Sequence, residues 1–194
     1  SALELTLGIP PDRETQGLYD ECVAGLGQSR SVLVGRHLEI ARIAAWLHAA
    51  PGERAGGLVI RGAAGVGKSA LCREVRELAR GRGWTVVGVD AVQASRPYAV
   101  VCAAIEQLIL EDRSVLDSVG GPARSVLATL SPLAGPEPDL PGPLGRHQVI
   151  GAFRRLLLAA SGAGPIMVQV DDADLADEAG ADVLVHLIGS GRPV

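Results

Sequence analysis

Several residue types are scarce in this chain of 194 residues, and each shortage excludes a class of protein. Aromatic side chains make up only 3% of the sequence, and the formal net charge of −4 leaves no excess of basic residues. The sequence contains no dense run of Lys and Arg that could follow a nucleic-acid backbone. We therefore do not expect this segment to bind DNA or RNA by itself.

Lysine is almost missing, because seventeen of the eighteen basic residues are arginine and Lys68 is the single lysine. The three cysteines, Cys22, Cys72 and Cys102, are an odd number without CxxC spacing, which argues against a disulfide framework and a zinc site. No apolar stretch approaches the roughly eighteen residues of a membrane span, and no secretory signal opens the chain. The sequence thus predicts a cytoplasmic protein without a membrane partner.

Hydrophobic residues are plentiful at 47%, and most are the small and branched aliphatics that fill parallel sheets. Apolar periodicity predicts helices at 36–49, 69–80, 97–110, 147–160 and 179–188, and strands at 57–61, 84–90 and 165–170. Five prolines between residues 131 and 145 predict an exposed loop. The alternation of strands and helices predicts an α/β fold in which one parallel sheet carries helices on both faces.

A glycine-rich segment between the first expected strand and the next helix matches the pattern G-x-x-x-x-G-K-S. The matching residues are Gly62, Ala63, Ala64, Gly65, Val66, Gly67, Lys68 and Ser69. The glycines let successive N–H groups face one anion at a helix N-terminus, and Ala70 continues this cradle. We expect Lys68 to act on the β- and γ-phosphates as a catalytic residue and Ser69 to bind Mg²⁺. The alternative is a glycine-rich turn with a lysine in it by chance.

An acidic pair follows the last expected strand. The apolar run 166–170 ends in Asp171 and Asp172, at the carboxyl edge where parallel sheets bind ligands. We expect Asp171 to hold Mg²⁺ and Asp172 to polarise an attacking water as a catalytic residue. The alternative for the pair is a helix N-cap, and that alternative also stays open for Asp174 and Asp177.

These two motifs together predict a three-layer P-loop fold that binds a nucleoside di- or triphosphate with Mg²⁺. Guanine-specific P-loop proteins use an Asn-Lys-x-Asp motif, and this chain has no second lysine. The sequence therefore favours ATP or ADP as the ligand.

The segment ahead of the phosphate loop resembles a known signature. Residues 31–40, SVLVGRHLEI, resemble the LVGRExEL signature of STAND and related AAA-like signalling ATPases. This resemblance implies that Val34, Gly35 and Arg36 line the adenine pocket, largely through their backbone. The alternative is an ordinary helix start.

Two further segments resemble parts of large bacterial transcriptional regulators. Residues 170–177, VDDADLAD, resemble the DDxxWxD block of the large ATP-binding LuxR-type regulators, with Leu175 in place of the tryptophan, and Pro97-Tyr98-Ala99 resembles their PYA segment. Residues 7–19 resemble the closing segment of the activator domain in SARP-type regulators. The resemblance implies a linker and activator-domain tail at 1–30, and the N-terminal part of a nucleotide-binding domain at 31–194 that ends before the sensor strand and lid.

By the same resemblance, the function is a regulatory switch with slow ATPase activity, in which the ATP or ADP state controls a flanking DNA-binding domain. DNA would be reached only through that upstream domain, which this chain lacks, and the ATP-bound form could assemble as a homo-oligomer. Asp172 favours slow turnover, because vigorous ATPases often carry glutamate there. The alternatives are a remodelling AAA ATPase that works as an oligomer with arginine fingers, and a scaffold without enzymatic activity.

Overall fold

The computed structural model describes residues 35–49, 56–91, 96–136, 138 and 142–189. The chain divides into two compact units, Ser1–Ala50 and Pro51–Val194, and each is described by itself. The segment predicted to be a linker and activator-domain tail, 1–30, lies outside the described residues. No helix in the described part of the chain is long and apolar enough to cross a bilayer.

The described part of the first unit contains helix α2 (His37–Ala49), which confirms the helix predicted over 36–49. Glu39 lies in its first turn, where a carboxylate complements the positive end of the helix dipole, and it pairs with Arg36 at 2.9 Å. Of the predicted apolar stripe, Ile40, Ile43, Ala44 and Leu47 are buried, whereas Leu38 in the first turn is 63% exposed. Apart from Leu38, the apolar stripe read from the sequence is therefore the buried face of this helix.

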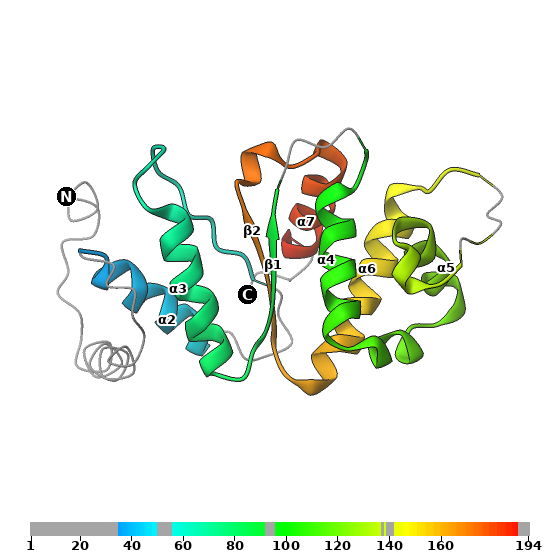
Figure 1. The fold of residues 1–194 in the computed structure, drawn as a ribbon, viewed down its shortest axis with the longest axis horizontal. Helices are drawn as coiled ribbons and strands as arrows, with labels where there is room; N and C mark the ends of the chain where they lie inside the picture. Colours follow the sequence, from blue (N-terminus) through cyan, green and yellow to red (C-terminus); the bar gives the residue numbers. More distant parts are fainter. Residues whose placement is uncertain (1–34, 50–55, 92–95, 137, 139–141, 190–194) are drawn as a thin grey trace. The chain divides into compact units, whose positions relative to one another are not determined.

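The second unit is built on two parallel strands, β1 (Thr85–Asp90) and β2 (Ile166–Asp171), which lie side by side in Figure 1. Their register pairs Thr85 with Ile166 at one end and Asp90 with Asp171 at the other. Both strands agree closely with the predicted ranges, and both are rich in the β-branched residues that favour a pleated surface. Because parallel strands point the same way, the last residues of both meet at one carboxyl edge.

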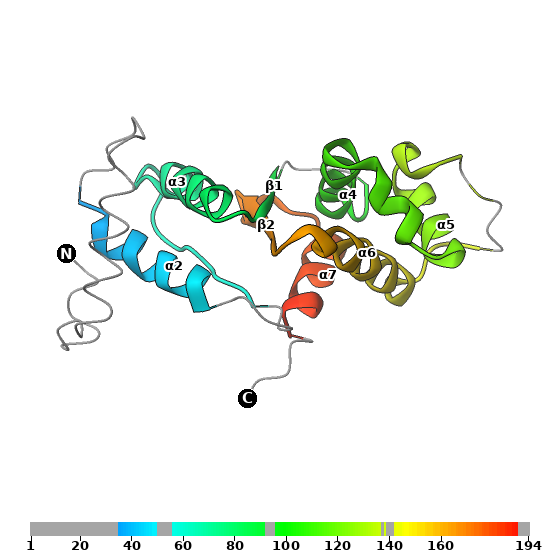
Figure 2. The ribbon, with the colours of Figure 1, turned by 90° about the horizontal axis from the view of Figure 1, so that it is seen from below.

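Helices cover both faces of this sheet. On one face lies α3 (Lys68–Gly81), whose Arg76 side chain packs so closely over Gly88 of β1 that an added Cβ would lie 2.6 Å from Arg76 Nη1. On the other face, Val87 and Val89 join a core with α4 (Ala99–Glu111), α6 (Arg146–Ala160) and α7 (Glu178–Gly189). Figure 2 shows α3 on one side of the strands and the other three helices on the opposite side. The predicted α/β fold with a parallel sheet between helices is confirmed.

The apolar core lies between the sheet and the α4, α6 and α7 layer. Its largest fully buried side chains include Phe153 of α6, Ile105 of α4 and Leu127 of α5 (Gly121–Leu130). Each such side chain contributes about 1.5–3 kcal/mol when it leaves water. This core holds the carboxyl edge of the sheet in place.

Three short elements between residues 111 and 135 were not predicted: the 3-10 turns η1 (Arg113–Ser118) and η2 (Pro132–Ala134), and helix α5. Turn-forming residues hid them, because Pro122 reads as a helix breaker although it sits in the first turn of α5, where proline is tolerated. The exposed proline-rich loop predicted over 131–145 therefore begins with a 3-10 turn, in which Ala134 is buried.

The strand predicted over residues 57–61 is wrong for the described structure. These residues carry no strand assignment, and Leu58 and Val59 are 47% and 71% exposed. A β-branched sequence becomes a strand only beside a partner, and the described sheet consists of β1 and β2 alone, so 57–61 pairs with neither strand. Sequence preference alone was therefore insufficient to place this segment in the sheet.

Candidate functional site

The glycine-rich loop leads directly into the N-terminus of α3. Residues 62–66 are exposed, and Gly65 and Gly67 have φ angles of 77° and 90°, which side chains with a Cβ rarely adopt. At Gly62 an added Cβ would lie 2.9 Å from Val66 Cγ2, because the loop closes on itself there. The glycines of the motif thus occupy positions where the backbone needs them.

The start of α3 carries unused backbone donors. The first hydrogen bond of the helix runs from Leu71 N–H to Gly67 O at 3.0 Å, so no helical carbonyl accepts the N–H groups of Lys68, Ser69 and Ala70. Together with the helix dipole, such groups attract an anion. This geometry fits a phosphate group.

Lys68 adds a positive charge to the same place. Its Nζ donates to the carbonyl oxygens of Gly62 and Ala63, both at 3.1 Å, so the amine lies back over the loop. Both acceptors are uncharged, and no described carboxylate forms an ion pair with this amine. Its charge is therefore available to an anionic ligand of the loop.

Asp171 lies at the carboxyl end of β2, near the start of α3. Burial raises the pKa of the Cys72 thiol, and the negative charge of the nearby Asp171 carboxylate raises this pKa further. Figure 1 shows the start of α3 and the carboxyl end of β2 at the same end of the sheet. The elements that carry Ser69 and Asp171, the start of α3 and the end of β2, thus lie at one end of the sheet, and the Mg²⁺ site stays a prediction.

Asp172 begins the turn that follows β2. Its backbone is left-handed, with φ 48°, and its N–H donates to Asp171 Oδ1 at 3.0 Å. Its side chain is exposed and forms no capping hydrogen bond with the 3-10 turn η4 (Ala173–Leu175). The helix-cap alternative therefore does not describe Asp172, whereas Asp177 does cap α7 by accepting Gly180 N–H at 2.7 Å.

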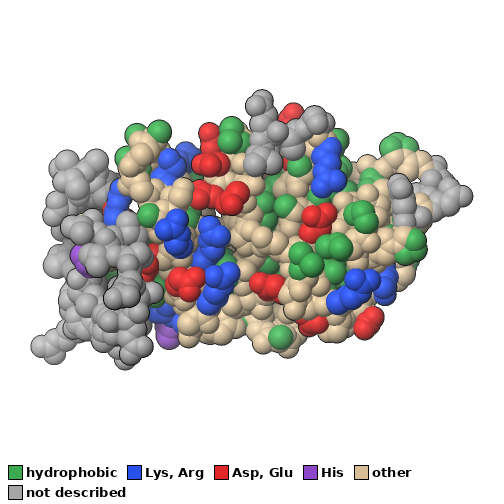
Figure 3. All heavy atoms as spheres, in the orientation of Figure 1, with side chains coloured by type: hydrophobic (Ala, Val, Ile, Leu, Met, Phe, Trp, Pro, Cys, Tyr) green, Lys and Arg blue, Asp and Glu red, His purple; other side chains and the backbone are tan. Residues whose placement is uncertain are grey.

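Asp90 is a carboxylate at this edge that sequence reasoning missed. It is exposed at the end of β1 and pairs in register with Asp171, so both side chains leave the same face of the sheet. Figure 3 shows acidic side chains gathered over the ends of β1 and β2. The available signal was an acidic residue at the end of the strand predicted over 84–90.

The residues predicted to line the adenine pocket belong to the first unit. Gly35 is exposed in a turn with φ 83°, Arg36 is half-buried in its ion pair with Glu39, and Val34 lies outside the described residues. Because the two units are described separately, the adenine pocket stays a prediction.

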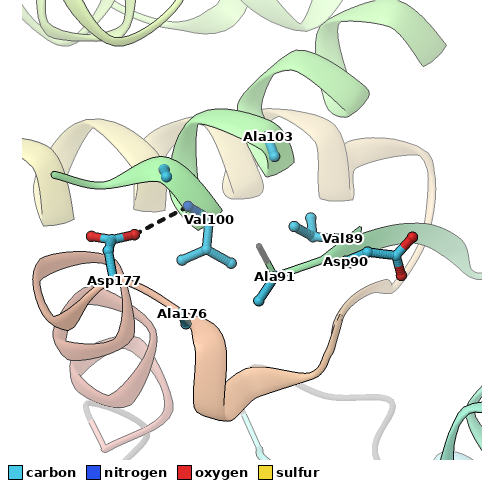
Figure 4. Close-up of a pocket in the computed structure, with 8 residues that line it drawn as sticks. Val89, Asp90, Ala91, Val100, Ala103, Ala176 and Asp177 are labelled. Carbon is cyan, nitrogen blue, oxygen red and sulfur yellow. Dashed lines mark hydrogen bonds between the residues drawn. The ribbon is translucent and has the colours of Figure 1, made fainter. Parts of the chain in front are cut away.

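The segment 172–177, between β2 and α7, is called the acidic turn below. A small cavity of about 50 Å³ lies beside this turn, between the end of β1 and the start of α4. Figure 4 shows Val89, Val100 and Ala103 pointing toward it and Asp90 pointing away. A water molecule occupies about 30 Å³ in the liquid, so this cavity is too small for a nucleotide. No residue of the phosphate loop lines it.

Comparison with known proteins identifies one family. The family model described as AAA ATPase domain matches residues 32–193. No curated protein and no solved structure matches the chain. The match covers the phosphate loop, the acidic pair and every described helix and strand.

Proposed function

The chain belongs to the AAA ATPase domain family, and from that premise we propose that it binds ATP or ADP with Mg²⁺ and hydrolyses ATP slowly, as a regulatory switch. The observation that carries the proposal is that two motifs lie at one end of the sheet: the glycine loop with Lys68 at the start of α3, and the carboxyl end of β2 with Asp171. A phosphate cradle next to an acidic strand end is the arrangement that phosphoryl transfer requires.

Each motif residue has a separate task in this proposal. The N–H groups of the loop and of Lys68, Ser69 and Ala70 hold the phosphate oxygens, while the Lys68 amine balances the charge on the β- and γ-phosphates. The Ser69 hydroxyl and the Asp171 carboxylate are the oxygen ligands that would hold Mg²⁺, which supplies charge neutralisation to the phosphates. Asp172, exposed at the start of its turn, accepts a proton from the attacking water.

The switch role rests on the side chain at position 172 and on sequence resemblance. Aspartate is one methylene shorter than the glutamate found at this place in rapid ATPases, so Asp172 has a shorter reach toward water. The segments 31–40 and 170–177 resemble STAND and large LuxR-type regulators, and residues 7–19 resemble SARP-type regulators. We propose that the nucleotide state biases a flanking DNA-binding domain, so that the contact with DNA lies outside this chain.

The decisive experiment measures nucleotide binding. The purified protein is denatured, any released nucleotide is identified by chromatography, and ATP and ADP are then titrated into stripped protein with Mg²⁺ by calorimetry. We expect Lys68→Ala to weaken binding about ten- to a hundredfold, because one charged contact to phosphate is lost. Arg154→Ala is the matched control, because it removes one exposed positive charge from α6 and should leave affinity unchanged.

Two outcomes would contradict parts of the proposal. If the wild-type protein binds no adenine nucleotide, the phosphate loop has another role. If it binds ATP but turns over faster than about 1 s⁻¹, the slow switch is wrong, and an ordinary ATPase takes its place. Sedimentation with ATP and with ADP then tests for the nucleotide-dependent oligomer that a remodelling ATPase requires.

A further inference from the structure

One carboxylate, that of Asp177, joins the acidic turn to the start of α4. Asp177 Oδ1 accepts the N–H groups of Tyr98 at 2.6 Å and of Gly180 at 2.7 Å, and its Oδ2 accepts Val100 N–H at 3.3 Å. Figure 4 shows the bond to Val100 across the gap between the two segments. A single side chain thus caps α4 and α7, although Tyr98 and Asp177 are 79 residues apart in the sequence.

We call the hydrogen bonds of the Asp177 carboxylate to Tyr98, Val100 and Gly180 the Asp177 clamp, and two backbone features make it possible. Tyr98 is left-handed, with φ 64°, a conformation that is unfavourable for a bulky residue and persists only when surrounding contacts fix it. Gly180 is equally constrained, because an added Cβ would lie 2.5 Å from Val100 Cγ1 and 2.6 Å from Asp177 Oδ2. An ordinary helix cap needs neither feature, so the clamp is more than a local helix start.

The clamp is linked to the candidate catalytic residue by a short, closed turn. Leu175 N–H donates to Asp172 O at 2.8 Å, and Ala176 N–H donates to Ala173 O at 3.3 Å. Asp172 therefore lies between two fixed points, the end of β2 and the anchored Asp177. Its left-handed backbone opens this closed turn.

We infer that Asp177 is a positioning residue for the proposed ATP hydrolysis: by anchoring the turn on α4, it holds the Asp172 carboxylate in its place at the edge of the sheet. This inference rests on the proposed function. In this role Asp177 contacts no phosphate and acts only through Asp172. When the anchor is lost, the turn relaxes and the carboxylate of Asp172 moves, while the phosphate loop stays intact.

The test compares turnover at saturating ATP with ATP affinity in Asp177→Asn and Asp177→Ala. We expect turnover to fall between about ten- and a hundredfold, because displacements near 1 Å have effects of that size, while the dissociation constant for ATP changes less than about threefold. Asp112→Ala is the matched control. Asp112 caps the exposed turn η1 through Ser114 N–H at 2.8 Å and Ser114 Oγ at 2.7 Å, so its loss removes a capping carboxylate that has no link to Asp172.

A double variant separates positioning from general stability. If Asp177 acts through Asp172, Asp172→Asn combined with Asp177→Asn should be no slower than Asp172→Asn alone. The inference would be overturned if the losses of turnover in the two single variants multiply in the double variant. It would also be overturned if Asp177→Asn and Asp112→Ala have the same turnover. Circular dichroism identifies variants that fail to fold, and if Asp177→Ala is among them, Asp177→Asn carries the test. Its amide oxygen can still accept hydrogen bonds on one side of the carboxylate's place, whereas its NH₂ group accepts none, so only part of the anchor is lost.

The proposed function can fail separately. A wild-type protein that binds no ATP overturns the nucleotide site itself. A wild-type protein that binds ATP without turnover overturns both hydrolysis and the positioning role, while binding and switching remain. Normal wild-type turnover with unchanged Asp177 variants overturns the positioning role alone.

Discussion

Left-handed backbone marks the residues that shape the candidate site. Gly65 and Gly67 turn the phosphate loop, Asp172 opens the acidic turn, and Tyr98 lies under the Asp177 clamp. Asp172 and Tyr98 are the two non-glycine residues with positive φ in the described chain, and both belong to the segments joined by Asp177. The two unfavourable conformations thus lie where contacts between distant segments, and not helix or strand preference, decide the shape of the backbone.

Gly67→Ala tests whether the phosphate loop requires a left-handed backbone at this position. Alanine at φ 90° costs about 1–2 kcal/mol, so we expect lower stability in urea unfolding and weaker ATP binding. Gly151→Ala is the control, because Gly151 lies at an exposed position of helix α6 with no atom within 4 Å of an added Cβ, and alanine should stabilise the protein by about 0.5–1 kcal/mol. If both variants respond alike, the left-handed requirement at Gly67 is refuted.

For single residues, the sequence predicted motifs better than contacts between residues that are distant in the chain. Lys68 and the Asp171-Asp172 pair could be recognised because their spacing is tied to a known chemistry. The contact of Asp177 with Tyr98 could not, because nothing in a linear sequence relates two positions 79 residues apart. Asp90 was missed for a similar reason: its importance comes from its register with Asp171.

Among the secondary-structure elements, the pairing of strands separates what the sequence could and could not predict. Strands β1 and β2 were expected, because both carry a compact apolar run; in the structure three residues of β1 are buried and β2 is half-buried throughout. The run 57–61 carries the same signal, yet it pairs with neither strand in the described structure. Strand preference is a property of a segment, whereas a strand needs a neighbour with matching donors and acceptors.

Hydrogen exchange should distinguish these segments. Ladder amides such as Thr85, which donates to Pro165 O at 2.9 Å, are protected by hydrogen bonds within the sheet. We expect peptides from β1 and β2 to exchange much more slowly than a peptide covering 57–61, measured by mass spectrometry. Equal protection would mean that 57–61 forms a third strand in solution, and our account of its exposure would be wrong.

For the whole molecule, ligand binding should appear as added stability. A nucleotide that binds only the folded chain at about one hundred times its dissociation constant contributes about 2.7 kcal/mol. For a chain of 194 residues this corresponds to a rise in Tm of about 5–11 °C. We expect this rise with ATP or ADP and Mg²⁺ in calorimetric scans. In Lys68→Ala the rise should be clearly smaller, because a ten- to hundredfold weaker affinity leaves about 0.4–1.4 kcal/mol at the same nucleotide concentration. An equal rise with GTP would contradict the preference for adenine.

The Asp177 clamp also has a consequence for how this protein can evolve. Gly180 accepts no side chain while Val100 and Asp177 keep their places, and Asp177 gains its second and third donors only while Tyr98 stays left-handed. Drift at any one of these positions therefore removes the selective advantage of the others. In descendants of this gene we expect positions 98, 177 and 180 to be inherited as a set or lost together, so that their joint presence traces the lineage in which the clamp is still under selection.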